Sequence, residues 1–201
     1  GQERAFGADT VLGQWLRAQP VIVKAGKVLF AHGGISKEVA SKNLSVEALN
    51  SAMRSYWGGQ HAPATALDAV LGNNGVTQYR GYFMDMPDAY GKASQADVDA
   101  ALRAYEADAI VVGHTLVDKV TPLYGKKVYA VDVNTNEAAQ EALVFENGVA
   151  TVVAVDSGRM LPPESEPRKV RSLSLFNSSD RAILKQMVER SYALSQLPQP
   201  Y

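Results

Sequence analysis

The sequence predicts an α/β fold, and three observations lead to that prediction. Short apolar runs at 28–31, 109–112 and 127–132 are typical of buried strands. An amphipathic segment at 94–107 ends directly before the second run, which is the helix-then-strand order of an α/β unit. The chain has 201 residues of which 46% are hydrophobic, enough to bury one core.

Helices are expected where a capping side chain precedes apolar residues at three- or four-residue spacing. These segments are 8–19, 36–43, 45–57, 94–107 and 179–194. Ser94 followed by Asp97 matches a capping box. The Gly-, Ala- and Pro-rich segment 58–66 is expected to be a loop, and its His61 a solvated side chain.

Strands are expected where apolar and β-branched residues cluster between turn residues. They are 21–24, 28–31, 109–112, 127–132, 142–146 and 149–155. The turn at 25–27 predicts a hairpin between the first two, and Asn147-Gly148 predicts one between the last two. We expect residues 1–156 to form one body, and residues 157–201 to be a strap and a C-terminal helix packed on it.

Composition excludes several classes of function. A net charge of −1 provides no basic surface for a nucleic acid. The apolar runs are too short to span a membrane. The sequence contains no cysteine, so disulfides and thiolate ligands are excluded and the redox compartment stays open.

Two predicted strands end at a histidine bordered by glycine, His32 and His114. Ligand sites of α/β folds gather at the carboxyl ends of strands, and neutral imidazole is the commonest transition-metal ligand in proteins. We therefore predict that His32 and His114 bind one divalent metal ion. Two protein ligands do not complete a catalytic site. The alternative, that each is a structural polar residue at a strand end, stays open.

Arg80 lies between Tyr79 and Tyr82, next to Gly81. Packing between aromatic rings can hold such a side chain while its planar guanidinium faces a bidentate anion such as phosphate. The alternative is a surface arginine whose stem lies over the tyrosine rings.

Three motifs together resemble a known family. They are Phe-Ala-His-Gly-Gly-Ile at 30–35, Tyr-Arg-Gly-Tyr at 79–82 and Val-Val-Gly-His-Thr at 111–115. In this order they resemble the second half of a calcineurin-like metallophosphoesterase of the phosphoprotein-phosphatase branch, in particular its bacterial Shewanella-like phosphatases. The resemblance covers most of residues 6–156. It implies part of a two-sheet metallophosphatase sandwich flanked by helices, with metals at the strand ends.

The resemblance also implies a site and a reaction. His32 and His114 would bind the same ion of a dinuclear centre, Gly33 and Gly34 would let the loop pass close to that ion, and Arg80 would grip the substrate phosphate. Two divalent ions of manganese, iron or zinc would share a hydroxide directed at phosphorus, and this chain would ligate only one of them in part. The substrate would be a phosphorylated protein or small molecule.

The earlier motifs of that family, such as Gly-Asp-x-His-Gly and Gly-Asn-His-Glu, do not occur in this sequence. The resemblance therefore implies the C-terminal part of a metal-dependent phosphatase. Its absent partner would be the N-terminal half of the same domain. The compartment, bacterial cytoplasm or periplasm, stays open. The isolated chain is then expected to bind metal weakly and hydrolyse little.

Two alternatives stay open. One is a non-catalytic metallophosphatase-like module that acts in binding or assembly. The other is an unrelated α/β protein with structural histidines, for which imidazoles more than about 8 Å apart would be evidence, because two ligands of one ion cannot be so distant.

Overall fold

The computed structural model describes residues 5–133, 141–154 and 160–161. The chain divides into two units, Gly1–Lys169 and Val170–Tyr201, and the second lies wholly outside the described residues. Apart from residues 160–161, the predicted strap and C-terminal helix at 157–201, including the helix at 179–194, also lie outside them. The division that we predicted at residue 156 therefore stays a prediction.

The central sheet has five strands in the order β1-β2-β3-β5-β4. They are β1 (Ile22–Ala25), β2 (Val28–Ala31), β3 (Ala109–Val112), β4 (Thr121–Leu123) and β5 (Val128–Ala130). β2, β3 and β5 run parallel, whereas β1 and β4 pair antiparallel at the two edges. The three parallel strands are buried almost throughout, as their continuous apolar runs predict. Strand β4 was not predicted, and Pro122 at its centre is tolerated because β4 is an edge strand.

The second sheet is antiparallel and has the order β6-β7-β8. It consists of β6 (Glu141–Glu146), β7 (Val149–Ala154) and β8 (Met160–Leu161). The predicted hairpin between β6 and β7 is confirmed, with Asn147 and Gly148 both at positive φ (51° and 79°). Two successive residues at positive φ form the turn whose twist matches that of the flanking strands.

Five helices are described: α2 (Val11–Ala18), α3 (Lys37–Ser41), α4 (Val46–Trp57), α5 (Ala64–Leu71) and α6 (Gln95–Ala104). Four begin after a Ser or Thr that accepts a hydrogen bond from a backbone N–H three residues on, and Ser94 and Asp97 form the predicted capping box. Helix α5 was not predicted, because it begins after Pro63 without a side-chain cap. Within the described part of the chain, no helix combines the length and the apolar character needed to cross a membrane.

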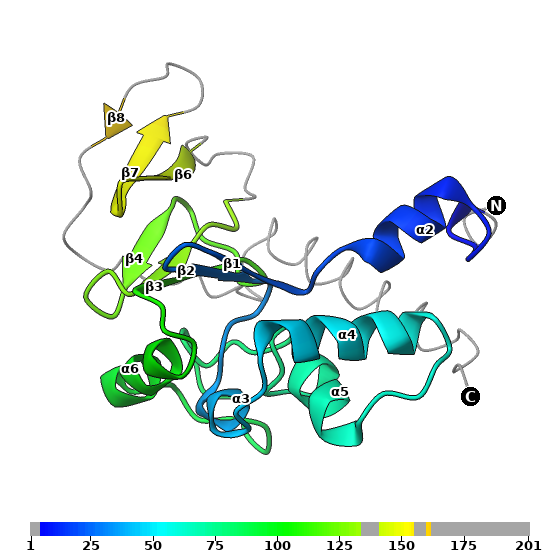
Figure 1. The fold of residues 1–201 in the computed structure, drawn as a ribbon. Helices are drawn as coiled ribbons and strands as arrows, with labels where there is room; N and C mark the ends of the chain where they lie inside the picture. The colour runs from blue at the N-terminus through cyan, green and yellow to red at the C-terminus, as the bar shows by residue number, and fades with distance from the viewer. Residues whose placement is uncertain (1–4, 134–140, 155–159, 162–201) are drawn as a thin grey trace, which may run out of the picture. The chain divides into compact units, whose positions relative to one another are not determined.

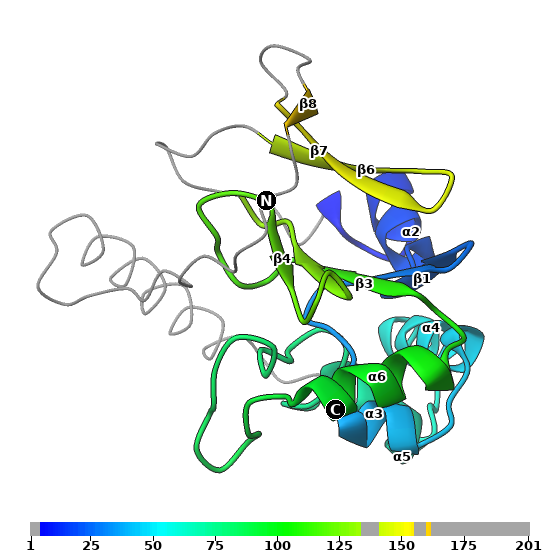
Figure 2. The ribbon, with the colours of Figure 1, turned by 90° about the vertical axis from the view of Figure 1, so that its left-hand side faces the viewer.

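Helices α3 to α6 lie on one side of the central sheet, and β6 and β7 lie on the other (Figures 1 and 2). On the helical side, one row of cross-strand neighbours is buried in every strand that it crosses, with exposed fractions of 1% for Ile22, 8% for Ala31, and 0% for both Val112 and Ala130. On the opposite side, Leu143 and Phe145 of β6 pack against a cluster that includes Val111 and Tyr129. The rings of Tyr129 and Phe145 meet edge to face, with centroids 5.6 Å apart.

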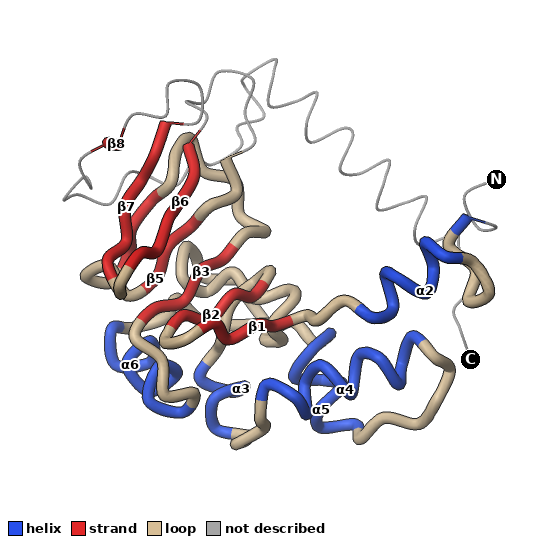
Figure 3. The backbone as a smooth tube through the Cα atoms, turned by 45° about the horizontal axis from the view of Figure 1, so that its top comes forward, coloured by secondary structure: helices blue, strands red, loops and turns tan. Residues whose placement is uncertain are grey.

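The predicted α/β class is confirmed by this mixed sheet and its helices (Figure 3). The finer prediction of a two-sheet sandwich is not confirmed. The second sheet contacts the central sheet, but Val23 and Phe30 on the same face of β1 and β2 are 41% and 37% exposed.

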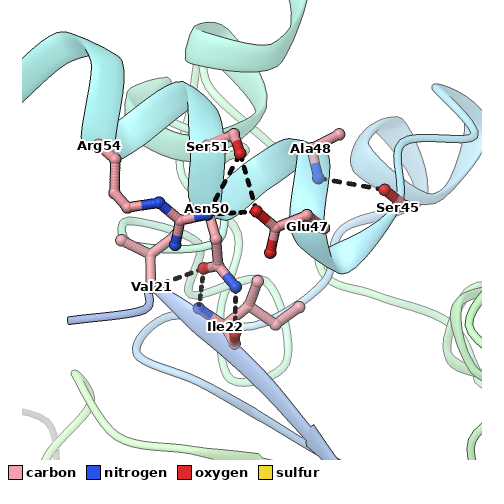
Figure 4. A network of polar contacts seen from close by, with 8 residues as sticks. All are labelled: Val21, Ile22, Ser45, Glu47, Ala48, Asn50, Ser51 and Arg54. Carbon is pink, nitrogen blue, oxygen red and sulfur yellow. Dashed lines mark hydrogen bonds and ion pairs between the residues drawn. The ribbon is translucent and has the colours of Figure 1, made fainter. Parts of the chain in front are cut away.

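One buried amide joins the helical layer to the edge of the sheet. The Asn50 side chain of α4 accepts hydrogen bonds from the backbone N–H groups of Val21 (2.9 Å) and Ile22 (3.2 Å), and donates one to the Ile22 carbonyl (2.9 Å) (Figure 4). Asn50 is only 6% exposed. It therefore satisfies backbone groups at the start of β1 that would otherwise be buried without partners.

We expect Asn50→Ala to lower the free energy of unfolding by about 2–3 kcal/mol, because it leaves buried backbone donors and an acceptor unpaired. Chemical denaturation followed by circular dichroism measures the change. The control is Asn73→Ala, which removes an exposed amide and should cost about 0.5 kcal/mol or less. Equal effects of the two substitutions would contradict the structural role of Asn50.

Candidate functional site

The site is built where β2 and β3 end side by side. The two strands are parallel, and Ala31 is the register partner of Val112. The residues that follow each strand therefore emerge at the same edge of the sheet, where the Gly113 N–H donates a hydrogen bond to the His32 carbonyl (3.0 Å). This pairing places the two predicted ligand loops next to each other.

The imidazoles of His32 and His114 are in direct contact. His114 Nδ1 lies 2.8 Å from His32 Nε2, and the ring centroids are 4.6 Å apart. His32 is exposed and His114 is partly buried. His114 Nε2 is buried with no hydrogen-bond partner among the described residues. The two rings thus converge, well within the 8 Å or so that a shared ion requires; that they bind one ion stays a prediction.

His114 adopts a backbone conformation that L-residues rarely occupy, with φ at +61°. The Thr115 N–H donates to the Gly113 carbonyl (2.6 Å), which closes a tight turn around His114. Strained backbone of this kind persists where the surrounding structure holds it, and it gathers at ligand sites. Here the turn directs the imidazole back toward His32.

Arg80 lies close enough to this pair to act on it electrostatically. The pKa of His114 is lowered to about 4, mainly because burial penalises the charged imidazolium, and further because of the positive charge of Arg80 and the proximity of His32. His114 is therefore neutral at pH 7. Arg80 is itself partly buried, between the buried Tyr79 and Tyr82. The structure thus brings His32 and His114 into contact and places Arg80 near enough to lower the pKa of His114.

Gly33 and Gly34 let the loop after β2 approach the loop that carries Arg80. A Cβ on Gly33 would lie 2.6 Å from the Tyr79 nitrogen, and one on Gly34 would lie 2.5 Å from a ring carbon of Tyr82. Both glycine N–H groups donate to the Val76 carbonyl, at 2.7 and 3.2 Å. The resemblance implied that these glycines permit approach to a metal ion; in the structure they permit approach to backbone and to an aromatic ring.

Tyr82 is a positioning residue to which the sequence analysis gave no role of its own. Its hydroxyl accepts from the Ile35 N–H (3.0 Å) and donates to the Ile35 carbonyl (2.8 Å), so it joins the loop of His32 to the loop of Arg80. The ring of Tyr82 also meets the edge of Tyr79 at 5.2 Å. The signal available in the sequence was the pair of tyrosines flanking Arg80. His61 is exposed in the loop before α5, as expected.

No family model matches the chain, and no curated protein matches it. Solved structures do. The cold-active protein-tyrosine phosphatase of a psychrophilic Shewanella species is 33% identical with a TM-score of 0.66, over 80% of this chain and 48% of that one. A structure of the cold-active protein-tyrosine phosphatase at 1.1 Å is 32% identical with a TM-score of 0.65, over 84% and 49%. A single-substitution variant is 34% identical with a TM-score of 0.63, over 79% and 47%.

The chain therefore spans about half the length of the solved structures that it matches. All three are named as phosphatases, which supports a phosphoesterase. The predicted membership of the calcineurin-like metallophosphoesterases is corrected, because the solved neighbours are named protein-tyrosine phosphatases and no family model matches.

The predicted reaction at a dinuclear metal centre is corrected together with the predicted family. The described residues contain no group of three or more His, Cys, Asp or Glu side chains that could hold a metal ion, so the two divalent ions that we expected have no ligand set in this part of the chain. The dinuclear centre was inferred from the family that the two histidine motifs resemble. The convergence of these histidines follows from the pairing of β2 with β3 and does not require the other metal ligands of that family.

The lowered pKa of His114 predicts a pH-dependent stability. The unfolded imidazole binds a proton at its ordinary pKa of about 6.5, whereas the folded one does so only at about pH 4. The contribution of neutral His114 to stability is therefore complete above about pH 6.5, and it is lost as the pH falls toward 4. We expect the melting temperature to fall more between pH 7 and 4.5 in the wild type than in His114→Asn. Asparagine suits this position because it tolerates positive φ.

Thermal unfolding followed by circular dichroism tests this difference, and an NMR titration of the His114 ring reports its pKa directly. His61→Asn is the matched control, because it removes an exposed imidazole. An ordinary His114 titration near pH 6.5 would be evidence against the buried, cation-flanked environment.

Proposed function

We propose that this chain is part of a phosphatase that hydrolyses phosphate monoesters, with phosphotyrosine side chains of proteins as the substrate class. The observation that carries the proposal is the contact of His32 with His114 at one edge of the sheet, with Arg80 near enough to lower the pKa of His114. The similarity to structures named protein-tyrosine phosphatases supports the reaction and the substrate class. Those names also favour an enzyme over the alternative of a non-catalytic binding module.

Arg80 is proposed to bind the phosphate. A guanidinium offers two parallel N–H donors that match two phosphate oxygens, and its charge is not lost at any physiological pH. Phosphoryl transfer depends chiefly on positioning and on neutralising the equatorial oxygens. Arg80 is partly buried, and its sequence neighbours Tyr79 and Tyr82 are buried, which favours a phosphate site on an ordered loop.

His32 and His114 are proposed to act on the reacting centre as carriers of a proton. At pH 7 His114 is neutral, so a ring nitrogen is free to accept a proton. His114 Nε2, which is buried and has no partner among the described residues, is the atom placed for that role. The sequence has no cysteine, so this chain supplies no thiolate nucleophile.

The complete reaction is proposed to need residues beyond these 201. The chain spans about half of each solved phosphatase that it matches, and His32 of the site lines an open groove. We therefore expect slow turnover from the 201 residues alone.

The test is phosphate release from a phosphotyrosine peptide by the complete gene product that contains these residues. We expect Arg80→Ala to lower kcat/KM by about 100-fold, because charge-assisted hydrogen bonds of about 1.5–3 kcal/mol are lost. Arg103→Ala, which removes an exposed arginine of α6, should leave kcat/KM unchanged. His32→Asn and His114→Asn should lower kcat by at least about 10-fold each.

A chelator arm tests this role of the histidines. We expect activity to survive EDTA, whereas a loss of activity that an added divalent ion reverses would contradict proton transfer. A complete gene product that releases no phosphate, or one in which the two arginine variants behave alike, would contradict the proposed function.

A further inference from the structure

An open apolar groove lies beside the candidate site. It has a volume of about 470 Å³, and its lining includes Val23, Phe30 and Val131, with His32 and Gly113 among its polar margin. Val23, Phe30 and Val111 of the lining belong to the face of the central sheet that β6 and β7 cover elsewhere, whereas Ile22, Ala31 and Val112 belong to the row on the helical side. The groove therefore includes an uncovered part of an otherwise buried face.

A single row of cross-strand neighbours shows where β6 and β7 stop covering this face of the central sheet. The row runs over β1, β2, β3 and β5, with exposed fractions of 41% for Val23, 37% for Phe30, 6% for Val111 and 8% for Tyr129. The β3 and β5 members lie under Phe145 and its neighbours, whereas the β1 and β2 members do not. The corresponding row on the helical side is buried in all four strands. Because Val28 of β2 is buried in the same cluster, the second layer ends within β2.

We propose that this groove is the docking surface for a polypeptide segment equivalent to the part of the solved phosphatases that this chain does not cover. That part amounts to about half of each of those structures, which is enough chain to complete a layer over β1 and β2. The lining is largely apolar and carries no charged side chain, so the occupant presents an apolar face to it. Because His32 lies at the margin, the segment would also close one side of the site.

The proposal concerns binding and is tested without an activity assay, so its failure and that of the proposed function are distinguishable. The uncovered part of the Shewanella phosphatase is produced as a separate polypeptide and titrated into this chain by isothermal calorimetry. We expect saturable 1:1 binding that Val23→Asp and Phe30→Asp each weaken by at least about 10-fold. Val144→Asp is the matched control, because Val144 is 43% exposed on β6 and does not line the groove.

A labelling experiment covers the case in which a charged variant does not fold. The chain has no cysteine, so Val23→Cys and Val144→Cys each introduce one unique thiol. We expect a maleimide to label both in the isolated chain. Addition of the segment should slow labelling at position 23 by at least about 10-fold and leave position 144 unchanged.

Three results would overturn the proposal. The first is no binding, or equal weakening by the groove and control variants. The second is a thiol at position 23 that is already protected in the isolated chain and becomes reactive when the chain is shortened to residue 161, which would assign the groove to residues 162–201. The third is a dimer in light scattering that Phe30→Asp converts to a monomer, which would assign it to a second copy.

Discussion

The parallel pairing of β2 with β3 is the constraint on which the site depends. The backbone hydrogen bonds of the ladder set the register, and side chains alternate between the two faces of a strand. With Ala31 opposite Val112, His32 and His114 leave the sheet at one edge, and their ring nitrogens come to 2.8 Å. A slip by one residue would reverse the face of every side chain in one strand and separate the rings. The buried apolar residues of both strands oppose such a slip.

The same pairing explains the electrostatic character of the site. His114 is held partly buried by a turn at positive φ, and burial together with the charge of Arg80 keeps it neutral at pH 7. These features suit the proposed roles, in which the guanidinium binds an anion and the imidazoles exchange a proton. The tyrosines around Arg80 and the hydroxyl of Tyr82 hold the two loops together. These features agree with the similarity to phosphatases, and the activity is argued from the site, since fold alone does not define function.

The two faces of the central sheet are covered to different extents. Helices bury one face across all the strands, whereas on the other face Val23 of β1 and Phe30 of β2 stay exposed beside the buried cluster of Val28, Val111 and Tyr129. The exposed apolar side chains of β1 and β2 form the surface on which we propose that a further segment docks. The chain spans about half of each solved phosphatase that it matches.

The sequence by itself determined the local structure. Apolar runs located the parallel strands, Ser94 and Asp97 located the start of α6, and Asn147-Gly148 located the hairpin, because strand burial, helix capping and tight turns are set by nearby residues. It also identified His32, Arg80 and His114 as candidates. Helix α5 and strand β4 escaped prediction, since one has no capping side chain and the other is a three-residue edge strand.

Only the tertiary structure decided what surrounds those candidates. The distance between the imidazoles, the lowered pKa of His114, the approach of Gly33 and Gly34 to the Tyr79–Tyr82 loop and the open half of the sheet all depend on residues far apart in the chain. Short motifs report local geometry and carry no information about the remaining ligands of a site. That is the physical reason why the residues were found from the sequence, whereas the metal centre and the family inferred from them had to be corrected.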